Sequence, residues 1–96
     1  MRYFHRTSVS PDAVIAEAER FFGRTLSSTR RESREVGFTG TIGTVTVSVG
    51  MEGGHYVRIT VQTDQVGESE LDKLAKRFLG VVHTKAEPEH ELRGAY

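Results

Sequence analysis

The sequence predicts a single α+β domain in which two amphipathic helices cover one face of an antiparallel sheet. Two neighbouring segments, 41–51 and 55–63, alternate apolar and polar residues, as strands do when one side of a sheet is buried. Two other segments, 11–22 and 68–82, carry apolar residues at helical spacing. Because every element has one apolar side, packing both helices on the apolar side of the sheet buries them all.

Length and composition limit the class of protein. The 96 residues suffice for one domain with its own core, and 13 basic residues balance 13 acidic ones. The chain has no cysteine, which excludes disulfides, thiolate catalysis and cysteine-bound metal clusters. No apolar run approaches the roughly 18 residues of a membrane span, and residues 1–6 do not read as a signal peptide. We therefore expect a cytoplasmic protein with no membrane partner.

The first strand is short, and its sequence does not determine which of its two faces points to the core. Between Tyr3 and Val9, the odd-numbered residues would lie on one face and the even-numbered residues on the other. Phe4 is the largest purely apolar side chain of the segment, yet Tyr3 belongs to the opposite set. The alternation therefore predicts a strand without saying which of its sides faces the core.

The next segment carries strong helix-start signals. Ser10 can accept amide protons of the first turn, Pro11 suits the first helical position, and Asp12 favours the positive end of the helix dipole. Gly23 is typical of a helix end. The stripe expected to face the core comprises Val14, Ala18, Phe21 and Phe22.

Three strands are expected after a polar connector over 24–28. The first spans 30–38, with its charged start, 30–35, forming a self-paired edge. The second and third are 41–51 and 55–63, joined by a turn over 52–54 with two glycines. The side chains expected to face the core are Val36, Phe38, Val45, Val47, Val49, Met51, Val57, Ile59 and Val61.

A second helix is expected over 68–82. Its apolar stripe comprises Leu71, Leu74, Ala75, Phe78 and Val82. Asp72 and Lys76 stand four residues apart, the spacing of a stabilising surface pair on a helix. The polar segment 83–96 is expected to form a flexible tail, so the domain proper would be 1–82.

The resulting order, (β)αβββα, describes a two-layer sandwich. It resembles the TATA-binding-protein-like and helix-grip sandwiches, which also combine a curved antiparallel sheet with a long C-terminal helix. The resemblance rests on element order over most of the chain and not on a motif, so it implies a fold and no functional residues.

The other face of the sheet is expected to be bare, and it is the candidate site. The residues expected on it are Thr44, Thr46, Ser48, Tyr56, Arg58, Thr60 and Gln62. One interpretation is an ordinary solvated face, rich in threonine because threonine favours strands. The other is an interaction surface, most simply a homodimer made by twofold pairing of sheets, with Tyr56 and Arg58 as anchors.

Two further hypotheses remain open. A small ligand, or a minor enzymatic reaction, could use a cavity of about 300 Å³ or more between sheet and helices. Single-stranded nucleic acid could stack on the bare face at Tyr56 and Arg58, with Arg6 nearby, but the zero net charge argues against nucleic-acid binding.

Catalytic and metal motifs are not found in the sequence. His5, His55, His83 and His90 show no recognised ligand spacing, and the glycines near residue 53 lie in a hairpin turn rather than before a helix. We therefore expect a non-enzymatic domain without catalytic residues, metal or cofactor.

Overall fold

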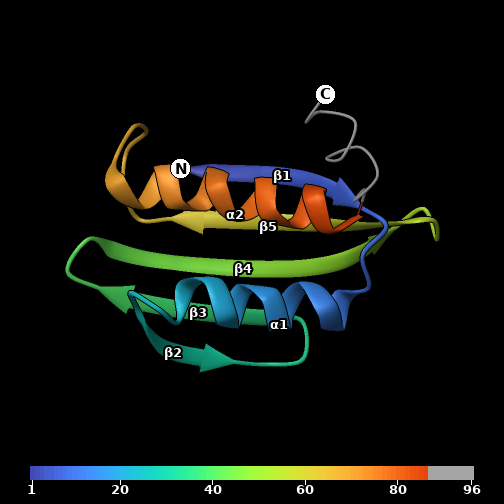
Figure 1. Ribbon diagram of the computed structural model, residues 1–96, viewed down its shortest axis with the longest axis horizontal. Helices are drawn as coiled ribbons and strands as arrows, with labels where there is room; N and C mark the ends of the chain where they lie inside the picture. The colour runs from blue at the N-terminus through green and yellow to red at the C-terminus, as the bar shows by residue number, and fades with distance from the viewer. Residues whose placement is uncertain (87–96) are drawn as a thin grey trace.

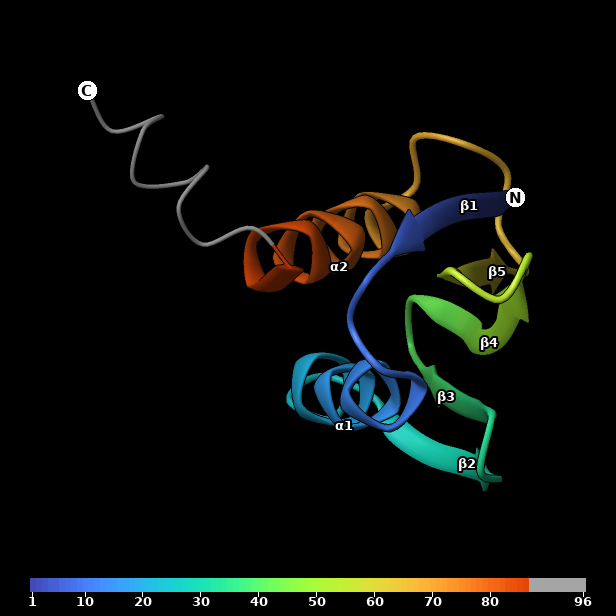
Figure 2. The ribbon, with the colours of Figure 1, turned by 90° about the vertical axis from the view of Figure 1, so that its right-hand side faces the viewer.

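The computed structural model describes residues 1–86, which form a two-layer α+β sandwich and confirm the predicted fold class (Figure 1). Both helices lie on one side of the sheet, and no element of the described chain covers the other side (Figure 2). The elements in order are β1 (Arg2–Thr7), α1 (Pro11–Phe22), β2 (Ser27–Arg31), β3 (Glu35–Gly40), β4 (Gly43–Glu52), β5 (Tyr56–Thr63) and α2 (Glu70–Ala86).

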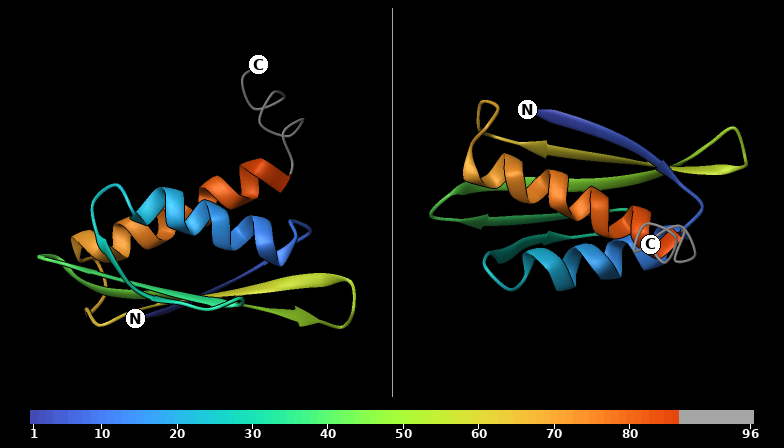
Figure 3. Two further views of the ribbon diagram at one scale, coloured as in Figure 1. Left: turned by 90° about the horizontal axis from the view of Figure 1, so that it is seen from below. Right: turned by 45° about the horizontal axis from the view of Figure 1, so that its top comes forward.

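Within residues 1–86, the sheet has five strands in the order β1-β5-β4-β3-β2, and every neighbouring pair is antiparallel. The long hairpin β4–β5 forms its centre, with Val47 opposite Val61. The first strand forms the edge beside β5 and contacts α2, so the first and last elements of the described chain are neighbours (Figure 3). None of the helices within 1–86 is long and apolar enough to cross a membrane.

The core lies between the sheet and the two helices, as the alternation predicts. Phe22 of α1 packs against Phe38 of β3 and Phe78 of α2, with ring centroids 5.5 and 5.3 Å away. All three rings are almost completely buried. Burial of such side chains contributes about 2 kcal/mol each, so this cluster is a main source of stability.

The N-terminus of α1 is built as the sequence predicts. The side chain of Ser10 accepts a hydrogen bond from the backbone N–H of Ala13 at 3.3 Å, and Pro11 occupies the first turn. The helix ends at Phe22, and Gly23 donates its backbone N–H to the carbonyl of Glu19 at 3.0 Å.

The segment expected as one strand over 30–38 is two strands. The backbone N–H of Glu32 donates to the carbonyl of Glu35 at 2.8 Å and closes a turn between β2 and β3. Every residue of β2 is exposed, so the strand carries no apolar alternation by which it could be recognised. Its charges are paired, because Arg30 contacts Glu35 at 3.1 Å and Arg31 contacts Glu19 at 3.0 Å.

Helix α2 differs from the expectation at both ends. It begins at Glu70 because Ser69 is its N-cap, accepting the backbone N–H of Asp72 at 3.0 Å. It continues to Ala86, so residues 83–86, expected in the tail, are helical. The rest of the expected tail, 87–96, lies outside the described residues.

Two side chains point differently from the expectation. Met51 is 59% exposed, because the end of the β4–β5 hairpin extends past both helices (Figure 1) and leaves its apolar side uncovered. Asp72 is fully buried and does not pair with Lys76, whose amine contacts Glu68 at 3.5 Å instead.

Candidate binding face

The face of the sheet opposite the helices is here called the open face. The structure places all seven predicted residues on it, because their neighbours along β4 and β5 point into the core. Thr46 lies opposite Gln62 and Ser48 opposite Thr60, so small polar side chains form its centre. Tyr56, Arg58 and Gln62 are exposed, whereas Thr44, Thr46, Ser48 and Thr60 are half-buried among their neighbours.

Strand β1 adds residues to the open face. The sequence alone does not say on which side of the sheet these residues lie. Tyr3, His5 and Thr7 point toward the helices, so Phe4 and the arginines on either side of it face outward. Phe4 lies opposite Thr60 and is 53% exposed. The alternation of the strand assigns the residues to two sides correctly, and the side that faces the helices is the one on which Tyr3 contacts α2.

An aromatic–arginine cluster occupies one end of the open face. The guanidinium carbon of Arg58 lies 4.3 Å from the ring centroid of Phe4, within the range of a cation–π contact. Arg6 reaches across β5 and makes two hydrogen bonds to the carboxylate of Glu52, at 3.0 and 2.9 Å. These bonds hold the pKa of Glu52 below its ordinary value. The ring of Tyr56, opposite Glu52, is 54% exposed.

Two shallow hollows lie on the open face. One, of about 260 Å³, is centred on Thr46, Thr60 and Gln62, and the hydroxyl of Ser48 donates to Glu35 at 3.1 Å beside it. The other, of about 500 Å³, runs along Phe4 and Arg58 over Gly50. A methyl group built on Gly50 would meet no atom within 4 Å, so the second hollow has open space above its floor.

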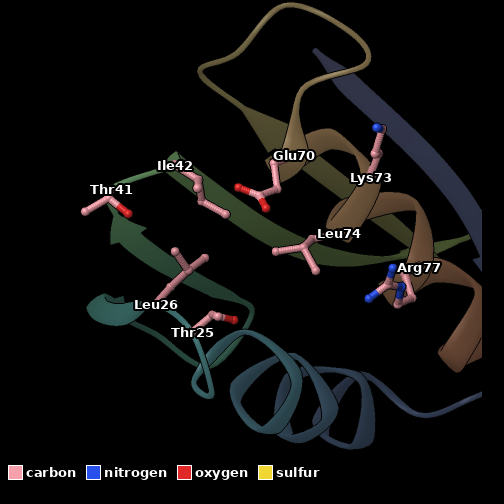
Figure 4. Close-up of a pocket in the computed structure, with 8 residues that line it drawn as sticks. All are labelled: Thr25, Leu26, Thr41, Ile42, Glu70, Lys73, Leu74 and Arg77. Carbon is pink, nitrogen blue, oxygen red and sulfur yellow. The ribbon is translucent and has the colours of Figure 1, made fainter.

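A third hollow lies at one end of the sandwich and is here called the end pocket (Figure 4). Its volume is about 480 Å³. It is formed by three segments: the connector after α1, the β3–β4 turn and the first turns of α2. The side chains that line it are Thr25, Leu26, Thr41, Ile42, Glu70, Lys73, Leu74 and Arg77.

A buried carboxylate ties the open sheet to α2. Oδ1 of Asp72 accepts hydrogen bonds from the hydroxyls of Tyr3 and Thr63, and Oδ2 accepts one from Ser69. Desolvation raises the pKa of Asp72, but the bonds from Ser69, Tyr3 and Thr63 together outweigh it and leave the pKa below its ordinary value. Because both oxygens of the carboxylate accept hydrogen bonds, the network is suited to holding elements together rather than to proton transfer.

Metal-binding geometry is not found within residues 1–86, where no group of three or more histidine or acidic side chains converges. The rings of His5 and His83 meet edge to face, with centroids 5.9 Å apart. Desolvation and the neighbouring His83 both lower the pKa of His5. The pair joins β1 to the last turns of α2.

Compared with known proteins, the chain matches no family model and no curated protein. Its fold therefore defines its class: residues 1–86 form a small two-layer α+β sandwich in which no described element covers one face of the sheet.

Proposed function

We propose that this domain is a non-enzymatic protein-binding module whose open face pairs with a second copy of the chain. The observation that carries the proposal is the exposure of two aromatic rings, Phe4 and Tyr56, beside Arg58 on a sheet face that no described element covers. Tyrosine and arginine are enriched among residues that dominate binding energy at protein interfaces. A cytoplasmic location, expected from the sequence, is part of this proposal.

The dimensions of the open face fit such a role. The molecule measures 37 × 32 × 21 Å along its principal axes, and the sheet lies across the two longer ones (Figure 1). A face of this size has room for the roughly 800 Å² that each partner buries in a standard interface. A twofold axis in the plane of the contact would bring identical faces together, so one surface serves both subunits.

In this proposal, the parts of the open face have different roles. Phe4, Arg58 and Tyr56 would supply the desolvated anchors at one end. The small polar side chains at the centre, among them Thr46 and Ser48, would allow close approach of the second sheet and offer hydroxyls for hydrogen bonds. Because the centre is polar, we expect an interface with bridging water and reversible association.

Sedimentation equilibrium over a wide concentration range tests the proposal. We expect a monomer–dimer equilibrium for the natural chain. Gly50→Lys should shift it to monomer, because the new side chain would fill the hollow over Gly50 without touching the fold. Tyr56→Ser should weaken dimerisation at least tenfold by removing an anchor. Val66→Ser is the matched control, because Val66 is 87% exposed but lies in the loop before α2.

Two results would contradict self-association through this face. One is a monomer at every concentration up to about 1 mM, which corresponds to association weaker than about 4 kcal/mol. The other is a dimer that survives both Gly50→Lys and Tyr56→Ser. A labelled single-stranded oligonucleotide at low salt provides a further check, since binding that Arg58→Ala abolishes would assign the face to nucleic acid instead.

Small-ligand binding is a second candidate function, and one observation favours it. The end pocket, at about 480 Å³, is within the range of about 300 to 1,000 Å³ typical of ligand sites. It lies at the end of the sandwich, whereas the space between sheet and helices is filled by the packed aromatic rings.

A further inference from the structure

The end pocket has an apolar wall that the fold positions firmly. Leu26 lies four residues after the end of α1, and its backbone N–H donates to the carbonyl of Phe22 at 2.8 Å, which directs the connector back toward the sheet. Its side chain is 7% exposed. Ile42 from the β3–β4 turn and Leu74 from α2 are half-buried and pack against the core. These three aliphatic side chains offer a surface for the apolar part of a ligand.

Charged side chains of α2 surround this wall. Glu70, Lys73 and Arg77 lie on one side of the helix, at spacings of three and four residues. None of the three has an ion pair within residues 1–86, although Lys76 on the same helix contacts Glu68 and Lys85 contacts Glu17. Two positive charges four residues apart are mildly unfavourable on a helix without a counter-ion. The rim of the pocket thus carries two cationic side chains that form no ion pair in the described part of the chain.

The directions of these side chains give the pocket two ends. In Figure 4, the carboxylate of Glu70 and the side chain of Leu74 extend toward Ile42 and Leu26, and the guanidinium of Arg77 lies beyond Leu74. Lys73 turns its amine away from Leu26. Arg77 lies seven positions after Glu70, which is roughly 10 Å along a helix. An acidic end and a basic end are therefore separated by the length of a medium acyl chain.

We infer that the end pocket binds a small amphipathic carboxylate. This inference develops the second candidate function and is independent of the open face. The apolar chain lies along Leu26, Ile42 and Leu74, and the carboxylate pairs with the guanidinium of Arg77. That planar fork can hold both carboxylate oxygens. Lys73 adds attraction from nearby. Glu70 repels the carboxylate from the opposite end of the pocket, so the ligand enters in one orientation.

Titration of the isotope-labelled full chain with octanoate, followed by amide chemical shifts, tests this inference. We expect saturable shifts in residues 25–26, 41–42 and 70–77. Octan-1-ol and octylamine, which have the same chain without the negative charge, should bind at least tenfold more weakly. Arg77→Gln should weaken octanoate binding at least tenfold, since a charge-assisted hydrogen bond is lost.

Substitutions of opposite charge make the test specific. Glu70→Gln should strengthen octanoate binding severalfold, because it removes the repelling carboxylate. Arg34→Gln is the matched control, an exposed arginine outside the pocket and without an ion pair in the described chain. The amide spectrum of each variant shows that it is folded.

Three results would overturn the inference. They are the absence of shifts up to millimolar octanoate, equal affinity for octanoate and octan-1-ol, and shifts centred on the open face. Sedimentation of Arg77→Gln separates this result from the dimer proposal. Its dimerisation should equal that of the natural chain whether or not octanoate binds, so either proposal can fail without the other.

Discussion

The hydroxyl of Tyr3 donates a hydrogen bond to Oδ1 of Asp72 at 2.9 Å, which joins strand β1 to helix α2. In the described part of the chain, strand β1 lies at an edge of the sheet and pairs with β5 alone. Edge strands are weakly held unless other contacts support them. The contact is made on the side of β1 that faces the helices, where His5 also meets His83, and Phe4 lies on the opposite side, on the open face.

Loss of one donor to this carboxylate should destabilise the fold. Thr63→Val removes a hydroxyl that lies 3.0 Å from Oδ1 of Asp72, and we expect a loss of about 1–3 kcal/mol in the free energy of unfolding. Tyr3→Phe should act in the same direction. Thr60→Val, on the open face, should change stability by less than about 0.5 kcal/mol. Urea unfolding measures all three, and equal effects of Thr63→Val and Thr60→Val would contradict the role assigned to the network.

The same network predicts a loss of stability in acid. The pKa of Asp72 in the folded state is below its ordinary value of 3.8, so the ionised carboxylate stabilises the fold above about pH 4. That contribution is lost as the pH falls from 3.8 through the lowered folded pKa. Asp72→Asn should therefore be less stable than the natural chain at pH 7, with the difference narrowing below pH 4. Urea midpoints across this pH range would reveal it, and a constant difference would refute it.

The histidine pair predicts a second fall in stability, at a higher pH than that of Asp72. Desolvation and His83 lower the pKa of His5 below 6.5 in the folded state. The unfolded chain then takes up a proton before the folded chain does, so stability should fall as the pH drops below 6.5. His5→Gln should remove this step, whereas His55→Gln, in the β4–β5 turn, should leave it in place. Thermal midpoints between pH 7.5 and pH 5 provide the measurement.

The parts of the fold that alternation encodes could be predicted, and the parts that depend on distant partners could not. Strands β4 and β5 and both apolar stripes follow from local periodicity, since burial on one side leaves a regular pattern. Strand β2 has no buried residue and so leaves no such pattern. The burial of Asp72 depends on hydroxyls of Thr63, which lies on another element, and of Tyr3, which is 69 positions away in the sequence.

The two candidate sites also differ in how far the sequence alone predicts them. The open face could be predicted along β4 and β5, because alternation assigns Thr46 and Arg58 to the side opposite the valines. The contribution of β1 required knowledge of its packing partner. The end pocket could not be predicted, because three segments far apart in the sequence form it and none carries a ligand motif.

Glycine is required at Gly43, where the β3–β4 turn enters β4. Its φ is +129°, and a methyl group there would lie 2.6 Å from Oδ1 of Asp64 and 2.8 Å from Nε2 of Gln65. That oxygen also accepts the backbone N–H of Thr44 at 2.9 Å, so the methyl group would displace a hydrogen-bonded carboxylate. Gly43→Ala should cost about 2–4 kcal/mol through backbone strain and overpacking.

The matched control for this substitution is Gly50→Ala. Gly50 lies in a strand with open space around it, and alanine there should be neutral or stabilise the fold by up to about 1 kcal/mol. Calorimetry measures both variants, and Gly43→Ala should lower the melting temperature by about 4–8 °C per kcal/mol lost. Equal melting temperatures for the two variants would mean that the contact of Gly43 with Asp64 does not constrain the turn. If Gly50→Ala lowered the melting temperature strongly and Gly43→Ala did not, the space above Gly50 would already be filled, as it would be in a tightly packed dimer.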